Sequence, residues 1–287
     1  IMDELQQMLR AAFRTQNRMT LALPGTGTTG MEGAMANLLE PGDTIVICVL
    51  GYFGERMVDM AQRYGARVVR VDAEWGTTID PDQVRTALRE AGRVKAVAVV
   101  QGETSTGVLQ PLRAIAALVQ EAGALMIADA VTSFCTAELA VDEWGLDYVY
   151  SCSQKGLSCP PGLAPVTVSE RAMEAVHARR EPVHNWYLDL TLLEKYWGPE
   201  RVYHHTAPCS MNYALHEGLR VVLEEGLEAR VARHEKNAAA LAAACEAMGM
   251  PLQVAAGQRL PALTTVRIPA GVDDAQVPDA AHPELRV

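Results

Sequence analysis

Short runs of apolar residues recur along the chain, and stretches with the helical period separate most of them. The runs cover residues 19–23, 44–50, 67–71, 94–100, 125–128, 148–150 and 165–168. Strands that are buried on both faces of a parallel sheet show continuous rather than alternating apolarity, and helices between them serve as crossovers. The pattern therefore predicts an α/β fold with a mostly parallel sheet of the seven-stranded type, covered by helices on both faces.

Helical periodicity fills much of the chain between these runs. The expected helices cover residues 1–15, 29–39, 81–90 and 210–248, with one more that follows a turn at residues 51–54 and ends at residue 64. Asp80 stands directly before one of them as a cap. The long C-terminal helix is expected to break near Gly226, because glycine interrupts helices.

The end of the chain differs from the rest and suggests a second domain. A boundary near Glu225 would divide the chain into a large domain, residues 1–225, and a smaller, incomplete α+β domain, residues 226–287. Within the smaller domain the tail is expected to become extended around residues 264–268. The chain opens at Ile1 inside an amphipathic helix, which suggests that a segment precedes it.

Composition and charge restrict the classes of partner. Of the 287 residues 49% are hydrophobic, and the net charge is −10, from 25 basic and 35 acidic side chains. Without a basic cluster, nucleic acid and anionic membranes are not expected partners. No apolar run approaches the roughly 18 residues that span a bilayer, and no signal-peptide pattern opens the chain. The six cysteines are scattered, which favours reduced thiols in a cytoplasmic protein over zinc or disulfides.

A glycine-rich loop joins the first strand to a helix, with the sequence Gly25-Thr26-Gly27-Thr28-Thr29-Gly30. Glycines let the backbone approach a phosphate, and the helix N-terminus offers free N–H groups. A dinucleotide site would need an acidic residue at the end of the second strand, where this chain has Leu50-Gly51-Tyr52. The threonine hydroxyls favour a monoester phosphate instead. Taken alone, the loop could also be a purely structural turn.

Two charged residues end neighbouring strands. Asp129 follows the run 125–128, and Lys155 lies in a polar turn after the run 148–150. An aspartate in such a position is more often a helix cap or turn former, and a lysine is more often a surface residue. Both side chains, however, can reach the edge where open α/β sheets bind ligands. A buried carboxylate there can keep a pyridine nitrogen protonated, and burial would lower the pKa of Lys155 so that its amine attacks an aldehyde. Together with a phosphate cradle, these residues indicate pyridoxal phosphate.

Further motifs join these residues. They are Gly51-Tyr52-Phe53-Gly54, Gly102-Glu103-Thr104-Ser105-Thr106-Gly107-Val108, Asp129-Ala130-Val131, Ser151-Cys152-Ser153-Gln154-Lys155 and Tyr203-His204-His205-Thr206. In this combination the chain resembles the class V, fold type I aminotransferases that use pyridoxal phosphate, and among them the alanine–glyoxylate and serine–glyoxylate (serine–pyruvate) enzymes. The resemblance implies transfer of an amino group from alanine or serine to glyoxylate or pyruvate.

The resemblance implies a role for each site residue. Lys155 would hold the cofactor as a Schiff base and act as general base at the substrate's α-carbon, while Asp129 would pair with the pyridine nitrogen. Phe53 would stack on the ring. Further cofactor contacts are implied for Thr26, Gly27, Thr28 and Gln154 around the phosphate, for Thr104 near the ring oxygen and for Val131 behind the ring.

The resemblance also implies a homodimer, because Tyr203 and Thr206 would reach the phosphate of the neighbouring subunit. His204-His205 between them could suit a metal, but adjacent side chains point apart and the sequence shows no third ligand, so no metal is expected. The arginine that grips the substrate carboxylate in the family stands in a Leu-Arg-Ile-Gly context. Only Leu285-Arg286-Val287 is similar, which makes Arg286 the candidate.

Two other interpretations stay open. A cysteine desulfurase or another lyase would share the fold, although those enzymes usually have histidine where this chain has Gln154 and Phe53. A non-catalytic protein, either a cofactor-binding or a scaffold protein, is the third possibility, because Arg286 at the end of the chain is the sole candidate for the group that binds the substrate carboxylate.

Overall fold

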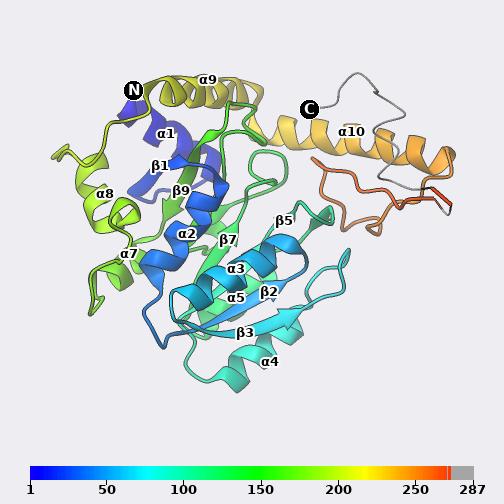
Figure 1. Cartoon of the computed structure of the whole chain (residues 1–287). Coiled ribbons are helices and arrows are strands. Elements are labelled where there is room, and N and C mark those ends of the chain that lie inside the picture. The colour runs from blue at the N-terminus through cyan, green and yellow to red at the C-terminus, as the bar shows by residue number, and fades with distance from the viewer. Residues whose placement is uncertain (270, 273–287) are drawn as a thin grey trace.

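A seven-stranded sheet forms the centre of the protein (Figure 1). The computed structural model describes residues 1–269, 271 and 272. The strands lie in the order β1-β9-β8-β7-β4-β2-β3. Their bounds are β1 Met19–Gly25, β2 Thr44–Val49, β3 Arg67–Asp72, β4 Ala96–Val100, β7 Leu125–Asp129, β8 Tyr148–Tyr150 and β9 Gly162–Val168.

Most of this sheet is parallel, as the sequence predicts. β8, β7, β4, β2 and β3 pair in parallel, whereas β9 runs antiparallel to both β8 and β1. Every residue of β2, β4 and β7 is buried. Burial on both faces explains the continuous apolarity of these runs, and it identifies the sheet as the main part of the hydrophobic core.

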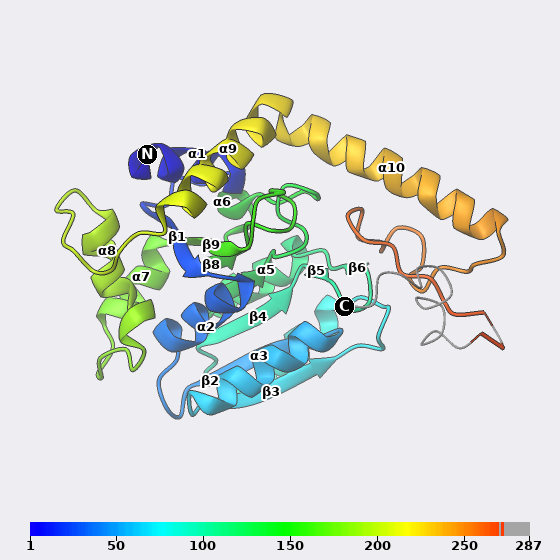
Figure 2. The same cartoon turned by 45° about the horizontal axis from the view of Figure 1, so that its top comes forward.

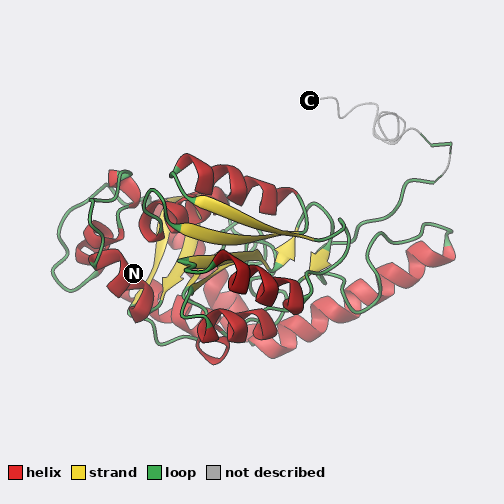
Figure 3. Ribbon diagram, turned by 90° about the horizontal axis from the view of Figure 1, so that it is seen from below, coloured by secondary structure: helices red, strands yellow, loops and turns green. Residues whose placement is uncertain are grey.

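Helices lie on both sides of the sheet (Figure 3). They are α1 Met2–Phe13, α2 Gly27–Leu38, α3 Tyr52–Arg63, α4 Pro81–Ala91, α5 Arg113–Glu121, α6 Val141–Trp144, α7 Glu170–His177, α8 Leu190–Trp197, α9 Cys209–Glu225 and α10 Leu227–Ala247, with a 3₁₀ turn at Trp186–Leu188. A separate hairpin consists of β5 Gly102–Glu103 and β6 Val108–Leu109. No helix among these is long and apolar enough to cross a membrane.

Two helix starts differ from the sequence prediction and one agrees with it. Asp80 caps α4, because its side chain accepts from the N–H of Asp82 at 2.9 Å. α2 begins at Gly27 rather than at residue 29, which places the glycine loop in its first turn. α3 begins at Tyr52, so residues 51–54 do not form a separate turn and Phe53 belongs to a helix.

The two C-terminal helices, α9 and α10, follow one another with a single glycine between them. Gly226 has φ +83° and separates α9 from α10, as predicted near that residue. α10 extends away from the sheet (Figure 2). The predicted extended tail is reduced to an isolated bridge between Leu252 and Val266. The division into domains at residue 225 stays a prediction.

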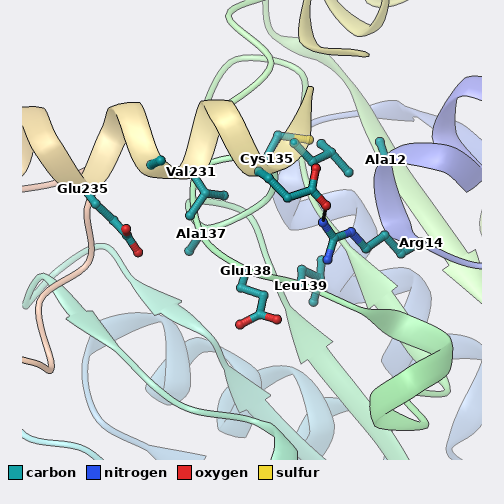
Figure 4. Close-up of a pocket in the computed structure, with 11 residues that line it drawn as sticks. Ala12, Arg14, Cys135, Ala137, Glu138, Leu139, Val231 and Glu235 are labelled. Atoms are coloured by element: carbon teal, nitrogen blue, oxygen red, sulfur yellow. Dashed lines mark hydrogen bonds and ion pairs between the residues drawn. The ribbon is translucent and has the colours of Figure 1, made fainter. Parts of the chain in front are cut away.

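A cavity of ≈ 260 Å³ lies between the start of α10, the end of α1 and residues 135–139 (Figure 4). Arg14 reaches across it to an ion pair with Glu228 in the first turn of α10. The carboxylate of Glu228 is exposed, so water and salt screen this ion pair and it contributes little to stability. None of the residues predicted for the cofactor lines this cavity.

Candidate active site

The candidate site is a cavity of ≈ 200 Å³ at the carboxyl ends of the strands β4 and β7. Open α/β sheets bind their ligands at this edge. Its lining consists of Thr26, Gly27, Thr28, Met31, Phe53, Arg56, Val100, Gly102, Thr104, Asp129, Val131, Gln154 and Lys155. The cavity thus brings together every residue that the sequence predicts for the chain's own cofactor site.

Asp129 ends β7 and is only 2% exposed. The backbone N–H of Val131 donates to its Oδ1 at 2.7 Å, and the hydroxyl of Tyr150 donates to its Oδ2 at 2.8 Å. Asp129 and Tyr150 are register partners on the parallel strands β7 and β8. The carboxylate is therefore held in one orientation while it forms part of the cavity wall.

The electrostatic balance at Asp129 favours a positively charged ligand. Burial raises the pKa of Asp129 to about 7, and the carboxylate of Glu103 also raises it, while Val131, Tyr150 and Arg56 act in the opposite direction. A cation placed against a carboxyl group in such surroundings stabilises its ionised form. A protonated ring nitrogen is a cation of this kind.

Lys155 lies in the turn that follows β8 and is exposed. The predicted burial of its amine is therefore wrong for this chain. The turn buries Ser151, Cys152 and Ser153 instead, and it carries Lys155 outward onto the cavity wall. The fold therefore places the Lys155 side chain beside the cavity but does not bury it.

The part of the cavity wall formed by the start of α2 is suited to an anion. Thr26 is the N-cap of α2, but its side chain caps no N–H of the described helix, so the hydroxyl and the first free N–H groups are open to a ligand. A Cβ atom at Gly27 would lie 2.6 Å from Val131 Cγ2, which explains why glycine is needed there. Arg56 Nη1 donates to Thr28 Oγ1 at 3.1 Å and adds a positive charge to the cavity wall.

Arg56 and Tyr150 belong to the site, although neither is among the residues predicted from the sequence. The guanidinium of Arg56 lies over the ring of Phe53, 4.9 Å from its centroid. Its position one helical turn after Phe53 is the signal that could have found it. Tyr150 ends β8 just as Asp129 ends β7, so the pairing of the two strands would have pointed to it.

Glu103 and Ser105 hold the start of α3, where the N-cap Gly51 has no side chain. Glu103 is fully buried, and its Oε2 accepts from the N–H of Phe53 at 3.2 Å. Ser105 Oγ donates to Glu103 Oε1 at 2.7 Å and accepts from the N–H of Tyr52 at 2.9 Å. Residues from another segment thus cap this helix and hold the backbone of Phe53 in place.

Thr104 lies beside this cap and lines the cavity together with Val131. Its hydroxyl shares a hydrogen bond with the hydroxyl of Thr132. The hydroxyl therefore has a fixed position, from which it can contact a ring substituent.

Tyr203 and Thr206 lie outside the cavity that holds the other predicted residues. Tyr203 is 75% exposed, and its hydroxyl is 3.3 Å from Thr206 Oγ1. The two hydroxyls form one exposed polar pair. The other outlying candidate, Arg286, lies beyond the described residues.

His204 and His205 face each other, so the prediction that their side chains point apart is wrong. Their Nδ1 atoms are 2.8 Å apart. His204 stacks on Trp186 with ring centroids 4.3 Å apart, and His205 packs on Tyr196 at 4.7 Å. Aromatic contacts on both sides turn the two imidazoles toward one another.

The arrangement fits pyridoxal phosphate. The Oε1 atom of Gln154 is buried and has no hydrogen-bond partner among the described residues, which costs stability unless a ligand satisfies the amide. Rotation of that amide presents its N–H₂ group, a donor for phosphate. The α2 N-terminus and Asp129 both line the cavity, which therefore offers partners for an anionic tail and for a cationic ring. Fold and site define an α/β enzyme of the pyridoxal-phosphate class.

Comparison with known proteins agrees with this class. The family model for class V aminotransferases matches residues 1–277. The (S)-ureidoglycine–glyoxylate transaminase of Bacillus subtilis (strain 168) is 41% identical over 299 residues, which cover 97% of this chain and 71% of the relative. The alanine–glyoxylate aminotransferase of Drosophila melanogaster is 36% identical over 286 residues, which cover 98% and 72%.

A solved structure of an aminotransferase is also similar to this chain. The alanine–glyoxylate aminotransferase from Nostoc sp. has a TM-score of 0.96 and 49% sequence identity, and the match covers 99% of this chain and 75% of that one. The chain belongs to the class V aminotransferase family. The predicted family, fold and cofactor are thereby confirmed.

Proposed function

We propose that this chain is a transaminase that moves the amino group of a small L-amino acid, alanine or serine, to glyoxylate or pyruvate. Membership of the family supports the reaction type, and all three relatives cited above have glyoxylate in their names. The observation that carries the proposal is the meeting of Lys155, Asp129 and residues 26–28 around one cavity.

Lys155 and Asp129 each have a chemical task in this reaction. Pyridoxal phosphate, when bound, supplies an aldehyde that takes up an amino group and a ring that withdraws electrons. Lys155 would hold the cofactor through its side-chain amine and, when free of it, would serve as the base for the proton on the substrate's α-carbon. Asp129 would pair with the ring nitrogen and keep it protonated.

The uncharged residues position the cofactor for these steps. Thr26 and Gly27 bind the phosphate through a hydroxyl and a backbone N–H, and Thr28 and Gln154 add side-chain contacts. Phe53 stacks on the ring and excludes water from one face. A phenylalanine offers less stacking area than a tryptophan would, so part of the orientation must come from the phosphate end.

We also propose a homodimer with shared sites and a cytoplasmic location. Tyr203 and Thr206 would bind the phosphate in the partner subunit, which is supported by their exposure and their position outside the chain's own cavity. The location rests on the sequence alone, where scattered cysteines favour a reducing compartment.

A second amino donor has support of its own. The relative with 41% identity is named for (S)-ureidoglycine, whereas the Drosophila relative, named for alanine, is 36% identical. Both names share glyoxylate, so the acceptor is better supported than the donor. (S)-Ureidoglycine is therefore included as a candidate donor.

The test compares initial rates for L-alanine, L-serine and (S)-ureidoglycine, each with glyoxylate and with pyruvate. We expect one donor to give the highest kcat/KM with glyoxylate as acceptor, and formation of glycine to match consumption of the donor. Formation of L-alanine from L-cysteine, with sulfide released on addition of a thiol reductant and without any transamination, would instead support a desulfurase. Binding of pyridoxal phosphate without turnover of any donor would support a non-catalytic protein.

A further inference from the structure

The strand β8 carries two buried tyrosines on the same face, and their hydroxyls have different partners. The hydroxyl of Tyr148 donates to the backbone oxygen of Gly30 at 3.1 Å. The hydroxyl of Tyr150 donates to Asp129 Oδ2 at 2.8 Å. The two rings touch edge to face, with centroids 6.2 Å apart. One tyrosine thus stabilises a helix, and the other contacts the carboxylate of the site.

The position of the Tyr150 hydroxyl is fixed from two sides. Asp129 and Tyr150 are partners in the parallel register of β7 and β8. On the other side, α2 packs closely, because a Cβ atom at Gly30 would lie 2.8 Å from Tyr150 Cβ. Because the backbone of Tyr150 is paired with β7 and its side chain packs against α2, its hydroxyl has little freedom to move away from Asp129.

We propose that Tyr150 is a positioning residue that holds Asp129 Oδ2 by a hydrogen bond and keeps the carboxylate ionised for the ring nitrogen of the cofactor. The inference rests on the role given to Asp129 in the proposed function. Tyr150 acts through Asp129, so its effect follows the charge of that carboxylate.

The charges around Asp129 explain why such a donor is needed. Burial raises the pKa of Asp129 to about 7, so the ionised form needs support. Burial, together with the neighbouring Asp129, raises the pKa of Tyr150 well above its usual range, so the hydroxyl stays a donor at every working pH. The other groups that face or influence Asp129 are Glu103 from β5, Arg56 from α3, the Val131 N–H, and Cys152 and Lys155 after β8.

The first test uses the full chain without added cofactor and compares Tyr150→Phe with Tyr148→Phe. Both variants keep a buried ring and lose one hydroxyl from the same strand. At pH 5 Asp129 is protonated, and at pH 8.5 it is ionised. Hydrogen bonds to a charged group are roughly twice as strong as neutral ones. The loss of Tm in Tyr150→Phe should therefore be about twice as large at pH 8.5 as at pH 5.

The control and a second background make the result decisive. The loss of Tm in Tyr148→Phe should be equal at the two pH values, since its acceptor is an uncharged backbone oxygen. In an Asp129→Asn background, the pH dependence of the Tyr150→Phe effect should disappear. A pH-independent loss in Tyr150→Phe, equal in pattern to that of Tyr148→Phe, would overturn the proposal.

The second readout is the dissociation constant of pyridoxal phosphate at pH 8, measured in a Lys155→Ala background so that binding is non-covalent. We expect Tyr150→Phe to weaken binding on the order of tenfold, a change of about 1.4 kcal/mol, and Tyr148→Phe to leave it unchanged. If the Tm test succeeds but neither Tyr150→Phe nor Asp129→Asn changes this constant, the hydrogen-bonded pair stands. The role of Asp129 at the ring nitrogen, and with it that part of the proposed function, then fails.

Discussion

Asp129 is a carboxylate in a place where burial opposes its charge. Its pKa of about 7 in the folded chain lies above the usual value of 3.8. Between these two values the folded chain without cofactor binds more protons than the unfolded chain. The stability that protonated Asp129 provides is complete below about pH 4 and is lost as the pH rises through 7.

This balance gives a pH-dependent prediction. Without cofactor, the free energy of unfolding should fall as the pH rises from about 4 to 7, by a few kcal/mol at most. Asp129→Asn should remove this part of the slope, because an amide does not titrate. Urea unfolding at several pH values measures both chains. An identical slope in the variant would mean that Asp129 titrates normally.

Some residues of the site were predictable from the sequence, and others were not. The spacing of strands and turns was enough to predict that Asp129, Lys155 and the glycine loop meet at one edge of the sheet, where they line one cavity. It did not reveal that Lys155 is exposed, because burial of a turn residue depends on which neighbours take the inner positions. Tyr150 and Arg56 were missed for a related reason, since their roles arise from contacts between separate elements.

At the scale of elements, the apolar runs predicted the strands of the main sheet, whereas the two-residue strands of the hairpin were not predictable. β2, β4 and β7 are fully buried, and their runs identified them within one or two residues. The hairpin of β5 and β6 has two residues in each strand, too few to show a period. Yet this hairpin supplies Glu103, which caps α3 and orients Phe53.

The cap gives a prediction for α3. Glu103→Gln should disturb the hydrogen bonds to Phe53 and Ser105, because the amide has only one acceptor oxygen. We expect a loss of roughly 1–3 kcal/mol in stability and weaker binding of pyridoxal phosphate, since Phe53 loses its orientation. Thermal unfolding and cofactor titration measure the two effects.

A cap far from the cavity serves as the control. Asp80→Ala removes the cap of α4 and should cost about 1 kcal/mol without any change in cofactor affinity. Equal affinity in Glu103→Gln and the unaltered chain would show that the cap stabilises α3 without serving the site.

At the scale of the whole molecule, the site is assembled from segments far apart in the sequence. Its walls come from residues 26–31, 53–56, 100–104, 129–131 and 154–155. The parallel order of the strands carries these segments to one edge of the sheet. Tyr203 and Thr206 remain outside, which is the basis for proposing that they complete the site of a partner subunit.

Mixed subunits test that proposal. One subunit carries Lys155→Ala, and the other carries Tyr203→Phe and Thr206→Ala. If Tyr203 and Thr206 serve the partner's phosphate, one site of the heterodimer collects all three changes and the other collects none. Activity should therefore reappear on mixing two preparations that are each defective. If every cavity depends only on its own subunit's residues, mixing restores nothing.

The most direct measurement of the central claim locates the covalent attachment of the cofactor. The full chain is incubated with pyridoxal phosphate, reduced with borohydride, digested and analysed by mass spectrometry, beside a Lys155→Ala variant. We expect a stable adduct on the peptide that contains Lys155 and no reducible adduct in the variant. An adduct on another lysine, or one that persists in Lys155→Ala, would contradict it.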